Sequence, residues 1–481
     1  MMIAYIENQE HKNQLFESFA RKMQAKGLPE EVIELFREYY FRFTTGTSGA
    51  MISEDDIMPV QQEKVAELNK LGSKEEEIGQ QALQQVVMIK LNGGLGTSMG
   101  MPYAKSLLEV KPGQTFLDLI LKQAETARDS SGTGSLALMN SFNTHQDTLD
   151  YFERRQIPAA VQPFCFLQNM YPKVDAQSLQ PAECADNPDM EWNPPGHGDI
   201  YAALLASGML DRLLQQGKRY AFISNADNLG AVIQPAILGY IMSRELPFLM
   251  EVAQRTESEK KGGHLAVLSD GTLVLREIAQ CPESDLESFQ DIEKHSYFNT
   301  NNIWLDLARF KEYVQTHGLP RLPLIVNPKT LDPRDDNSPL VYQLETAMGA
   351  AISEFSGSGA MLVGRDRFVP VKKTNDLLAV RSDCYVLAEN YQLMPNPQRT
   401  LPQIRIELDQ KIYKKVDQFE KRFPYGPPSL LQCEALEIEG DFLFEKNVNC
   451  KGRVQLINRG QQQQIIKSGT ELHGTQEFSA G

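Results

Sequence analysis

The sequence predicts an α/β protein with a helical N-terminal segment, an α/β core and a C-terminal β-helix. Three observations predict this order. Apolar residues recur at helical spacing near the start, short β-branched and aromatic runs then alternate with helical stretches, and a six-residue apolar repeat occupies the end. The chain has 481 residues, and about 150 residues per domain suggests roughly three domains. The predicted boundaries are 1–85 for the helical segment, 86–399 for the core and 400–481 for the β-helix.

The N-terminal segment carries signals for a helix end and a helix start. Gly27 suits the end of one helix, and Pro29 followed by two glutamates suits the first turn of the next. An apolar face follows at helical spacing, formed by Val32, Leu35, Phe36, Tyr39 and Tyr40. We expect an accessory layer here rather than a catalytic one.

The core alternates between predicted strands and predicted helices. The strands are expected at 86–89, 136–139, 220–224 and 247–252, and the helices at 115–127 and 200–216. This alternation implies parallel βαβ units in a doubly wound sheet, which binds ligands beyond the carboxyl ends of its strands. A hairpin is expected at 264–277, because Asp270 and Gly271 suit a tight turn.

The C-terminal repeat has two apolar positions in each period of six. They are occupied by Leu436, Phe442, Val448 and Val454, and by Ile438, Phe444, Cys450 and Leu456, with the phase continuing at Ile466 and Leu472 after a gap at Gly460. Such a period is typical of a β-helix, in which each short side contributes an inward residue. An irregular β-sandwich with accidental spacing is the alternative. Four consecutive matches favour the β-helix, and we expect it to serve capping or assembly.

Composition and charge limit the class of protein. Hydrophobic residues make up 41% and charged residues 23% of the chain, as in ordinary globular proteins and unlike collagen-like, disordered or disulfide-scaffold chains. The net charge of -15 argues against a general nucleic-acid binder but allows a local basic pocket. The six cysteines form no C-x-x-C pair, so they predict reduced thiols rather than a zinc or redox site.

No targeting or membrane segment is expected. The N-terminus turns polar within a few residues and does not resemble a signal peptide. The longest apolar runs of the whole chain fall far short of the ~20 residues that span a bilayer. We therefore expect a cytoplasmic protein without a membrane or nucleic-acid partner.

A glycine-rich loop is the strongest local signal for chemistry. Three glycines within four residues, Gly93, Gly94 and Gly96, follow the first predicted strand and let backbone N–H groups approach a phosphate or base. Neither a dinucleotide fingerprint nor a Walker A loop fits, because both need a glycine where Met99 stands. A tight turn is the alternative. The position after a strand and the following Lys105 favour a nucleotide loop.

A second candidate is the loop 192–199, of sequence WNPPGHGD. Its prolines fix the backbone and its glycines remove side-chain bulk around His197. A lone histidine is usually structural, but one flanked by glycines has little packing of its own. We therefore expect His197 to contact a ligand.

A third candidate is Asp227, which follows the predicted strand 220–224. A carboxylate at a strand end is a usual Mg²⁺ ligand when phosphates supply the other oxygens. An Asx-turn, in which Asp227 bonds only its own backbone, is an equally good interpretation of this residue alone.

The fourth candidate is the pair Lys372 and Lys373 beside a predicted strand. In an acidic chain they could guard a solvated sheet edge against pairing. They could equally supply the cation that a polyphosphate requires.

The combination of these motifs resembles a known family. The words KLNGGLGTSMG, NPPGHGD, SNADNLG, FNTNN and FVPVKKTNDLL occur in this order, with Lys105 and Ser106 after the first. Together they closely resemble the eukaryotic-type UTP–glucose-1-phosphate uridylyltransferases, also called UDP-glucose pyrophosphorylases, over essentially the whole chain. The resemblance implies a nucleotide-diphospho-sugar transferase core, Rossmann-like and GT-A-like with a mixed central sheet, and a left-handed C-terminal β-helix that can mediate homo-oligomers.

The resemblance also implies roles for individual residues. The loop of Leu91, Asn92, Gly93 and Gly94 matches the uracil and ribose contacts, and Gln168 matches the residue that reads the uracil edge. Gly196 matches a nucleotide contact, His197 a sugar-phosphate contact and Asn225 a sugar or ribose contact. Asp227 matches the Mg²⁺ ligand at the nucleotide, and Lys105 and Lys372 match the two phosphate-binding, catalytic lysines. On shorter words, Gly263, Glu277 and Asn302 match contacts to glucose hydroxyls.

The implied reaction converts UTP and glucose 1-phosphate into UDP-glucose and pyrophosphate with Mg²⁺. The sugar phosphate would attack the α-phosphorus in line, so positioning and charge neutralisation would supply most of the catalysis. The family commonly has Cys-Lys-Gly-Pro where this chain has residues 101–104, MPYA, which removes a positive charge near the phosphates. The alternatives are a related pyrophosphorylase with another or broader sugar 1-phosphate range, and a non-catalytic nucleotide-binding homologue.

Overall fold

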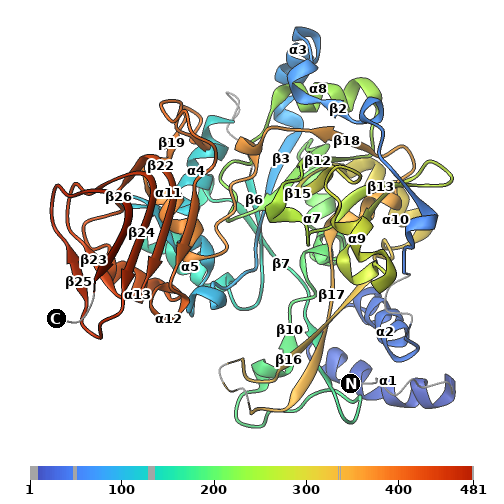
Figure 1. The fold of residues 1–481 in the computed structure, drawn as a ribbon. Coiled ribbons are helices and arrows are strands. Elements are labelled where there is room, and N and C mark those ends of the chain that lie inside the picture. The colour runs from blue at the N-terminus through green and yellow to red at the C-terminus, as the bar shows by residue number, and fades with distance from the viewer. Residues whose placement is uncertain (1–8, 47–50, 128–135, 334, 336, 479–481) are drawn as a thin grey trace.

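The computed structural model describes residues 9–46, 51–127, 136–333, 335 and 337–478. An eleven-stranded central sheet lies between a smaller three-stranded sheet and a set of C-terminal strands (Figure 1). Helices cover the central sheet, and the predicted α/β class with a mixed central sheet is confirmed.

The central sheet is mixed: along its main path a single antiparallel strand separates two groups of parallel strands. Its main path is, in order, β2 (Ala66–Glu67), β18 (Gly359–Leu362), β12 (Phe248–Gln254), β15 (Tyr297–Asp306), β11 (Tyr220–Asn225), β3 (Val86–Asn92), β6 (Leu136–Asn140) and β7 (Phe164–Leu167). Strands β11, β3, β6 and β7 pair in parallel, whereas β15 runs antiparallel to β11 and β12. The expected hairpin is confirmed as β13 (His264–Leu268) and β14 (Leu273–Arg276). The carboxyl ends of β3, β6 and β11 therefore meet at one edge.

Strand β3 shows why both faces of this sheet are covered. Val86 and Met88 belong to one apolar cluster, whereas Val87 and Ile89 belong to another. Successive residues of a strand point to opposite faces, so an unbroken apolar run needs a layer on each side. One cluster takes in α4 (Phe116–Thr126), α5 (His145–Arg154), α8 (Pro235–Arg244) and α11 (Thr374–Arg381), and the other α6 (Ile200–Ala206), α7 (Met209–Gln215) and α10 (Leu307–His317).

The single helix expected over 200–216 is divided into α6 and α7. Gly208 lies between them with φ +69°, a conformation that glycine adopts without steric cost. The sequence does not reveal this break, because the apolar spacing continues across it.

The N-terminal helices α1 (Gln9–Ala25) and α2 (Glu30–Thr44) form a layer against the small sheet, as expected of an accessory element. That sheet consists of β9 (Val174–Asp175), β16 (Leu324–Thr330) and β17 (Leu340–Thr346). Beyond α2, helix is found at α3 (Ser73–Gln81), but the expectation of helix is wrong at β1 (Ile57–Pro59) and at β2. These two short strands pair with β13 and β18, partners that local spacing does not reveal.

The C-terminal strands form the parallel coil that the six-residue repeat predicts. The ladder contains β21 (Arg405–Leu408), β22 (Ser429–Glu439), β24 (Asn449–Asn458) and β26 (Glu471–Phe478), and β23 (Phe442–Phe444) pairs with β25 (Gln464–Ile466). Leu436 lies beside Val454, three periods later, and all ten apolar repeat positions are buried. Cys450 lies beside Leu472, four residues beyond three periods, because the stretch around Gly460, from Leu456 to Gln464, is four residues longer than the paired stretch from Ile438 to Phe442. The handedness of the coil and the domain boundaries stay predictions.

Short elements complete the fold. They are β4 (Glu109–Lys111), β5 (Gln114–Thr115), β8 (Tyr171–Pro172), β10 (Trp192–Asn193), α9 (Leu286–Gln290), β19 (Tyr385–Leu387), β20 (Leu393–Pro395), α12 (Gln410–Tyr413) and α13 (Val416–Arg422). Among the described residues, no helix is both long and apolar enough to cross a bilayer.

Candidate active site

A cavity of about 790 Å³ lies beyond the carboxyl ends of β3 and β11. Ten of the predicted site residues line it: Leu91, Asn92, Gly93, Gly94, Lys105, Gln168, Gly196, His197, Asn225 and Asp227. They come from four segments far apart in the sequence, and the sheet brings them together. Lys372, Gly263, Glu277 and Asn302 do not line this cavity.

The glycine-rich loop is fixed by buried polar contacts at the end of β3. The Asn92 side chain donates to Asn140 Oδ1 at 2.8 Å and to Thr148 Oγ1 at 3.0 Å, so its amide anchors the loop. A Cβ at Gly93 would lie 2.2 Å from Gln168 Oε1. Glycine is therefore required for the Gln168 carboxamide to lie directly against the loop.

The loop 192–199 needs glycine for a similar reason. Gly196 has φ +80°, and a Cβ there would lie 2.5 Å from the carbonyl oxygen of Thr346. The close approach of β17 therefore shapes this loop and places His197 in the cavity wall.

The hydrogen bonding of His197 defines its proton position. The Met348 N–H donates to His197 Nδ1 at 3.0 Å, so the neutral ring carries its proton on Nε2. Burial, reinforced by the charge of Lys372, lowers the pKa of His197 to about 4. At neutral pH the ring is therefore an uncharged donor at Nε2.

This assignment predicts the titration of His197. The His197 ring signals in an NMR pH series should not move between about pH 5 and 8, with His197→Gln identifying them. Because the folded pKa lies below the ordinary value of 6.5, the unfolded chain binds the extra proton between about pH 4 and 6.5, and His197 makes stability rise with pH across that window. A midpoint near 6.5 would contradict the assignment.

Lys105 and Asp227 form an ion pair in the wall of the cavity. Their Nζ and Oδ2 atoms are 2.5 Å apart, and each side chain is 17% exposed. Asp227 lies in the turn after β11, and its carbonyl accepts from Val371 N–H at 3.3 Å. Its side chain faces a lysine rather than its own backbone, so the Asx-turn interpretation finds no support in these contacts.

The donor set at Asp227 fits a metal that phosphates help to hold. Among the described residues, no group of three or more His, Cys, Asp or Glu side chains could hold a metal ion. A cation here would have one protein carboxylate and would depend on phosphate and water oxygens, which is the coordination that Mg²⁺ accepts.

Lys372 lies beside the cavity on the loop that leads into α11. Its N–H and that of Lys373 donate to Asp376 Oδ2 at 2.8 and 2.9 Å, which holds the backbone of this loop. The neighbouring Pro370 forms a β-bridge with Asn228. The ammonium is near enough to His197 to lower the pKa of that ring.

The three predicted sugar contacts separate into two places. Gly263 and Glu277 are neighbours, since a Cβ at Gly263 would lie 2.6 Å from the Glu277 carboxylate, whose pKa burial raises. Asn302 is fully buried, and its amide donates to Glu251 Oε2 at 3.0 Å and to the Arg367 carbonyl at 3.1 Å. Asn302 thus supports the loop of Asp227 through its contact with Asn228, at 3.2 Å, and does not face the cavity.

Lys90 closes the base of the loop that presents Asp227. Its buried Nζ donates to Ser224 Oγ at 2.8 Å and to the Ala231 carbonyl at 2.9 Å, one on each side of the loop. Burial, with a contribution from Arg367, lowers the pKa of this lysine to about 7. This role of Lys90 could not be predicted from the sequence, because a single charged residue inside a buried strand belongs to no recognisable spacing.

The far wall of the cavity was also missed. It includes Lys173, Asn193, Lys329, Gln343 and Glu345, four of them isolated residues near the small sheet that follow no motif. Asn193 lies in the WNPPGHGD loop, which could have pointed to it. Two buried wall atoms, Ser106 Oγ and Asn193 Oδ1, have no hydrogen-bond partner among the described residues. Buried polar atoms are usually paired by protein, water or ligand.

The residues 101–104 that depart from the family pattern lie next to the glycine-rich loop. Met101 is buried, and its Sδ would lie 2.5 Å from a Cβ at Gly96. Ala104 forms a β-bridge with Leu95, and its N–H donates to Asp147 Oδ2 at 2.8 Å. This segment therefore supports the loop through packing and backbone contacts.

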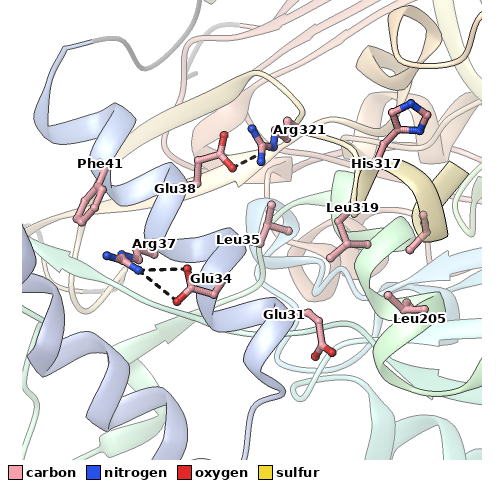
Figure 2. Close-up of a pocket in the computed structure, with 12 residues that line it drawn as sticks. Glu31, Glu34, Leu35, Arg37, Glu38, Phe41, Leu205, His317, Leu319 and Arg321 are labelled. Atoms are coloured by element: carbon pink, nitrogen blue, oxygen red, sulfur yellow. Dashed lines mark hydrogen bonds and ion pairs between the residues drawn. The ribbon is translucent and has the colours of Figure 1, made fainter.

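A second hollow of about 620 Å³ lies between α2 and the chain after α10. Figure 2 shows its acidic residues beside arginines: Arg37 lies 3.3 Å from Glu34, and Arg321 lies 3.3 Å from Glu38. No predicted site residue lines this hollow. We assign it no role in catalysis.

Comparison with known proteins places this cavity in context. A model of the UTP–glucose-1-phosphate uridylyltransferase family matches residues 33–451. A UTP–glucose-1-phosphate uridylyltransferase of Solanum tuberosum is 40% identical over 434 residues, which are 90% of this chain and 85% of the relative. A variant UDP-glucose pyrophosphorylase of Leishmania major, solved in complex with UDP-glucose, is 40% identical and has a TM-score of 0.87, with 97% of this chain and 99% of that chain covered. The open and closed structures of the Leishmania major enzyme match with the same TM-score, identity and coverage.

Proposed function

Because the chain belongs to the UTP–glucose-1-phosphate uridylyltransferase family, we propose that it makes UDP-glucose and pyrophosphate from UTP and glucose 1-phosphate. One observation carries the proposal: a single cavity joins the glycine-rich loop, Gln168, His197 and the Lys105–Asp227 pair. A nucleotide triphosphate needs such a combination, with close backbone approach at one end and cations at the other.

The reaction requires positioning and charge neutralisation rather than a protein nucleophile. An oxygen of glucose 1-phosphate attacks the α-phosphorus of UTP, a new P–O bond forms, and the bond to the β-phosphate oxygen breaks to release pyrophosphate. Bound Mg²⁺ would neutralise charge on the phosphates. Asp227 would hold the ion, Lys105 the UTP phosphates, and Lys372 the α-phosphate or the attacking sugar phosphate.

The nucleoside end is assigned to the loop of Leu91, Asn92, Gly93 and Gly94 and to Gln168. Asn92 would contribute through the loop backbone, because its side-chain donors are used within the protein. Gln168, which lies directly against Gly93, would read the uracil edge. Gly196 would contact the nucleotide.

The sugar phosphate is assigned to His197 and Asn225. The proton on His197 Nε2 suits a phosphate oxygen as acceptor. Gly263 and Glu277 would contact glucose hydroxyls after a closing movement, which would also bring Lys372 over the phosphates. Open and closed structures of the Leishmania major relative support such a movement. The contacts of Asn302 give a direct sugar contact no support.

An assay of pyrophosphate release tests this function. It should compare UTP with other nucleoside triphosphates, and glucose 1-phosphate with other sugar 1-phosphates, at several Mg²⁺ concentrations. We expect turnover only with Mg²⁺ and fastest with UTP and glucose 1-phosphate. Equal rates with N-acetylhexosamine 1-phosphates would favour a broad pyrophosphorylase, and tight UTP binding without turnover would favour a non-catalytic homologue.

Assembly and location remain predictions of the sequence. A homo-oligomer through the C-terminal coil and a cytoplasmic location are both compatible with the fold. Light scattering of the full chain would measure the first.

A further inference from the structure

Asp199 is a buried carboxylate that joins two walls of the cavity. It is 3% exposed and accepts from the backbone N–H of Asn169 at 2.6 Å and from Asn169 Nδ2 at 2.9 Å. Both of its oxygens are therefore engaged by one residue, in a two-pronged contact that fixes position and orientation together.

The two partners stand next to the residues assigned to the substrate. Asn169 follows Gln168, whose own N–H donates to the Asn140 carbonyl at 2.8 Å at the end of β6. Asp199 lies two residues after His197, where a short helical turn leads into α6. The contact thus ties the segment that carries Gln168 to the loop that carries Gly196 and His197.

Stability alone accounts poorly for this arrangement. The Asp199 side chain makes no ion pair with a described residue, and burial raises its pKa to about 7. A buried carboxylate without a cation is costly, and an apolar pair of similar size would often stabilise a protein as well or better. What the carboxylate adds is a fixed geometry for Asn169 and, through it, for Gln168.

Gln168 has little room for a second position. A Cβ added at Gly93 would lie only 2.2 Å from Gln168 Oε1. The carboxamide is therefore packed closely against the loop assigned to uracil. Uracil presents an acceptor, a donor and an acceptor on its edge, whereas cytosine presents a donor and two acceptors. Discrimination between these bases therefore depends on which carboxamide atom faces which base atom.

We propose that Asp199 is a positioning residue for nucleobase selection, which holds Gln168 through Asn169 so that uracil is accepted and cytosine is rejected. This inference rests on the proposed function, since it takes Gln168 as the residue that reads the base. Asp199 itself would touch no substrate.

The test removes the contact and then rebuilds it with the two partners exchanged. Asp199→Leu removes both acceptor oxygens and Asn169→Leu removes the side-chain donor, so each single variant loses the two-pronged contact. The double variant Asp199→Asn with Asn169→Asp restores it, because the new amide can accept from the backbone N–H and donate to the new carboxylate. The readout is the ratio of kcat/KM for UTP to that for CTP, which does not depend on how much of a preparation is folded.

We expect each single variant to lower this ratio by about 10- to 100-fold, through a higher KM for UTP, and the double variant to recover most of it. Asp306→Asn is the matched control: Asp306 is also buried, and it caps α10 away from the cavity, so this variant should lower stability without changing the ratio.

Two outcomes would overturn the inference while leaving the proposed function intact. One is an unchanged ratio in both single variants with rates that fall equally for UTP and CTP, and the other is a double variant no better than the single ones. A wild-type chain that shows no turnover, or no preference for UTP, would instead contradict the proposed function.

Discussion

Replacing Lys105 by alanine is expected to lower kcat by about three orders of magnitude while the chain still folds. The reaction brings two anions together, and Lys105, which lines the cavity 2.5 Å from Asp227, is the residue assigned to the UTP phosphates. Two unit charges 4 Å apart interact by about 4 kcal/mol at an effective dielectric constant near 20, which corresponds to about a thousandfold in rate. Steady-state kinetics with UTP and glucose 1-phosphate measure the loss, and circular dichroism checks the fold.

Two further lysine variants make this test specific. Lys372→Ala should cause a comparable loss of kcat, since Lys372 is assigned to the phosphates after closure. Lys311→Ala is the control, because Lys311 forms an exposed ion pair with Asp211 on the surface at 2.7 Å, and such pairs matter little. Near-wild-type turnover in Lys105→Ala or Lys372→Ala would show that the assignment of that lysine is wrong.

Replacing Asp227 by asparagine is expected to change the metal requirement as well as the rate. Asparagine keeps the size of the side chain but removes the negative charge that a hard divalent cation prefers. We expect kcat to fall by at least about 100-fold, and the Mg²⁺ concentration for half-maximal rate to rise by about tenfold. Titrating Mg²⁺ and Mn²⁺ into the assay gives both quantities.

The metal titration separates two roles of Asp227. If asparagine lowers the rate but leaves the Mg²⁺ dependence unchanged, Asp227 acts by orienting Lys105 and is not a metal ligand. Asp211→Asn, an exposed carboxylate outside the cavity, should leave both the rate and the Mg²⁺ dependence as they are.

Much of the fold and part of the candidate site follow from local signals in the sequence. The strands 86–89 and 136–139 are unbroken apolar runs and 220–224 is apolar up to Ser224, and burial on both faces of a sheet demands that pattern. Parallel strands direct their carboxyl ends to one edge, so the residues that follow β3 and β11 had to meet. The apolar repeat predicted the parallel coil because its period of six residues is the length of one side of a β-helix.

What the sequence could not predict depends on pairings between distant segments. Antiparallel β15 between β11 and β12, and the short strands β1 and β2, are defined by partners that local spacing does not reveal. Asn302 shows the same limit within the site, because only the fold places its amide against Glu251 and the Arg367 carbonyl instead of the cavity. Lys90 and the far wall with Lys173 could be found only once the sheet and the small sheet were in place.

The C-terminal coil and one face of the central sheet bury their side chains in a single apolar cluster, which contains Met88 and Leu138 as well as Leu436 and Val454. Water that enters between them would remove apolar contacts from both at once. Parts that share an interior lose it together, so we expect the coil and the sheet to unfold as one cooperative unit. A destabilising substitution in the coil would therefore reduce the amount of folded, active protein, although it changes no residue of the cavity.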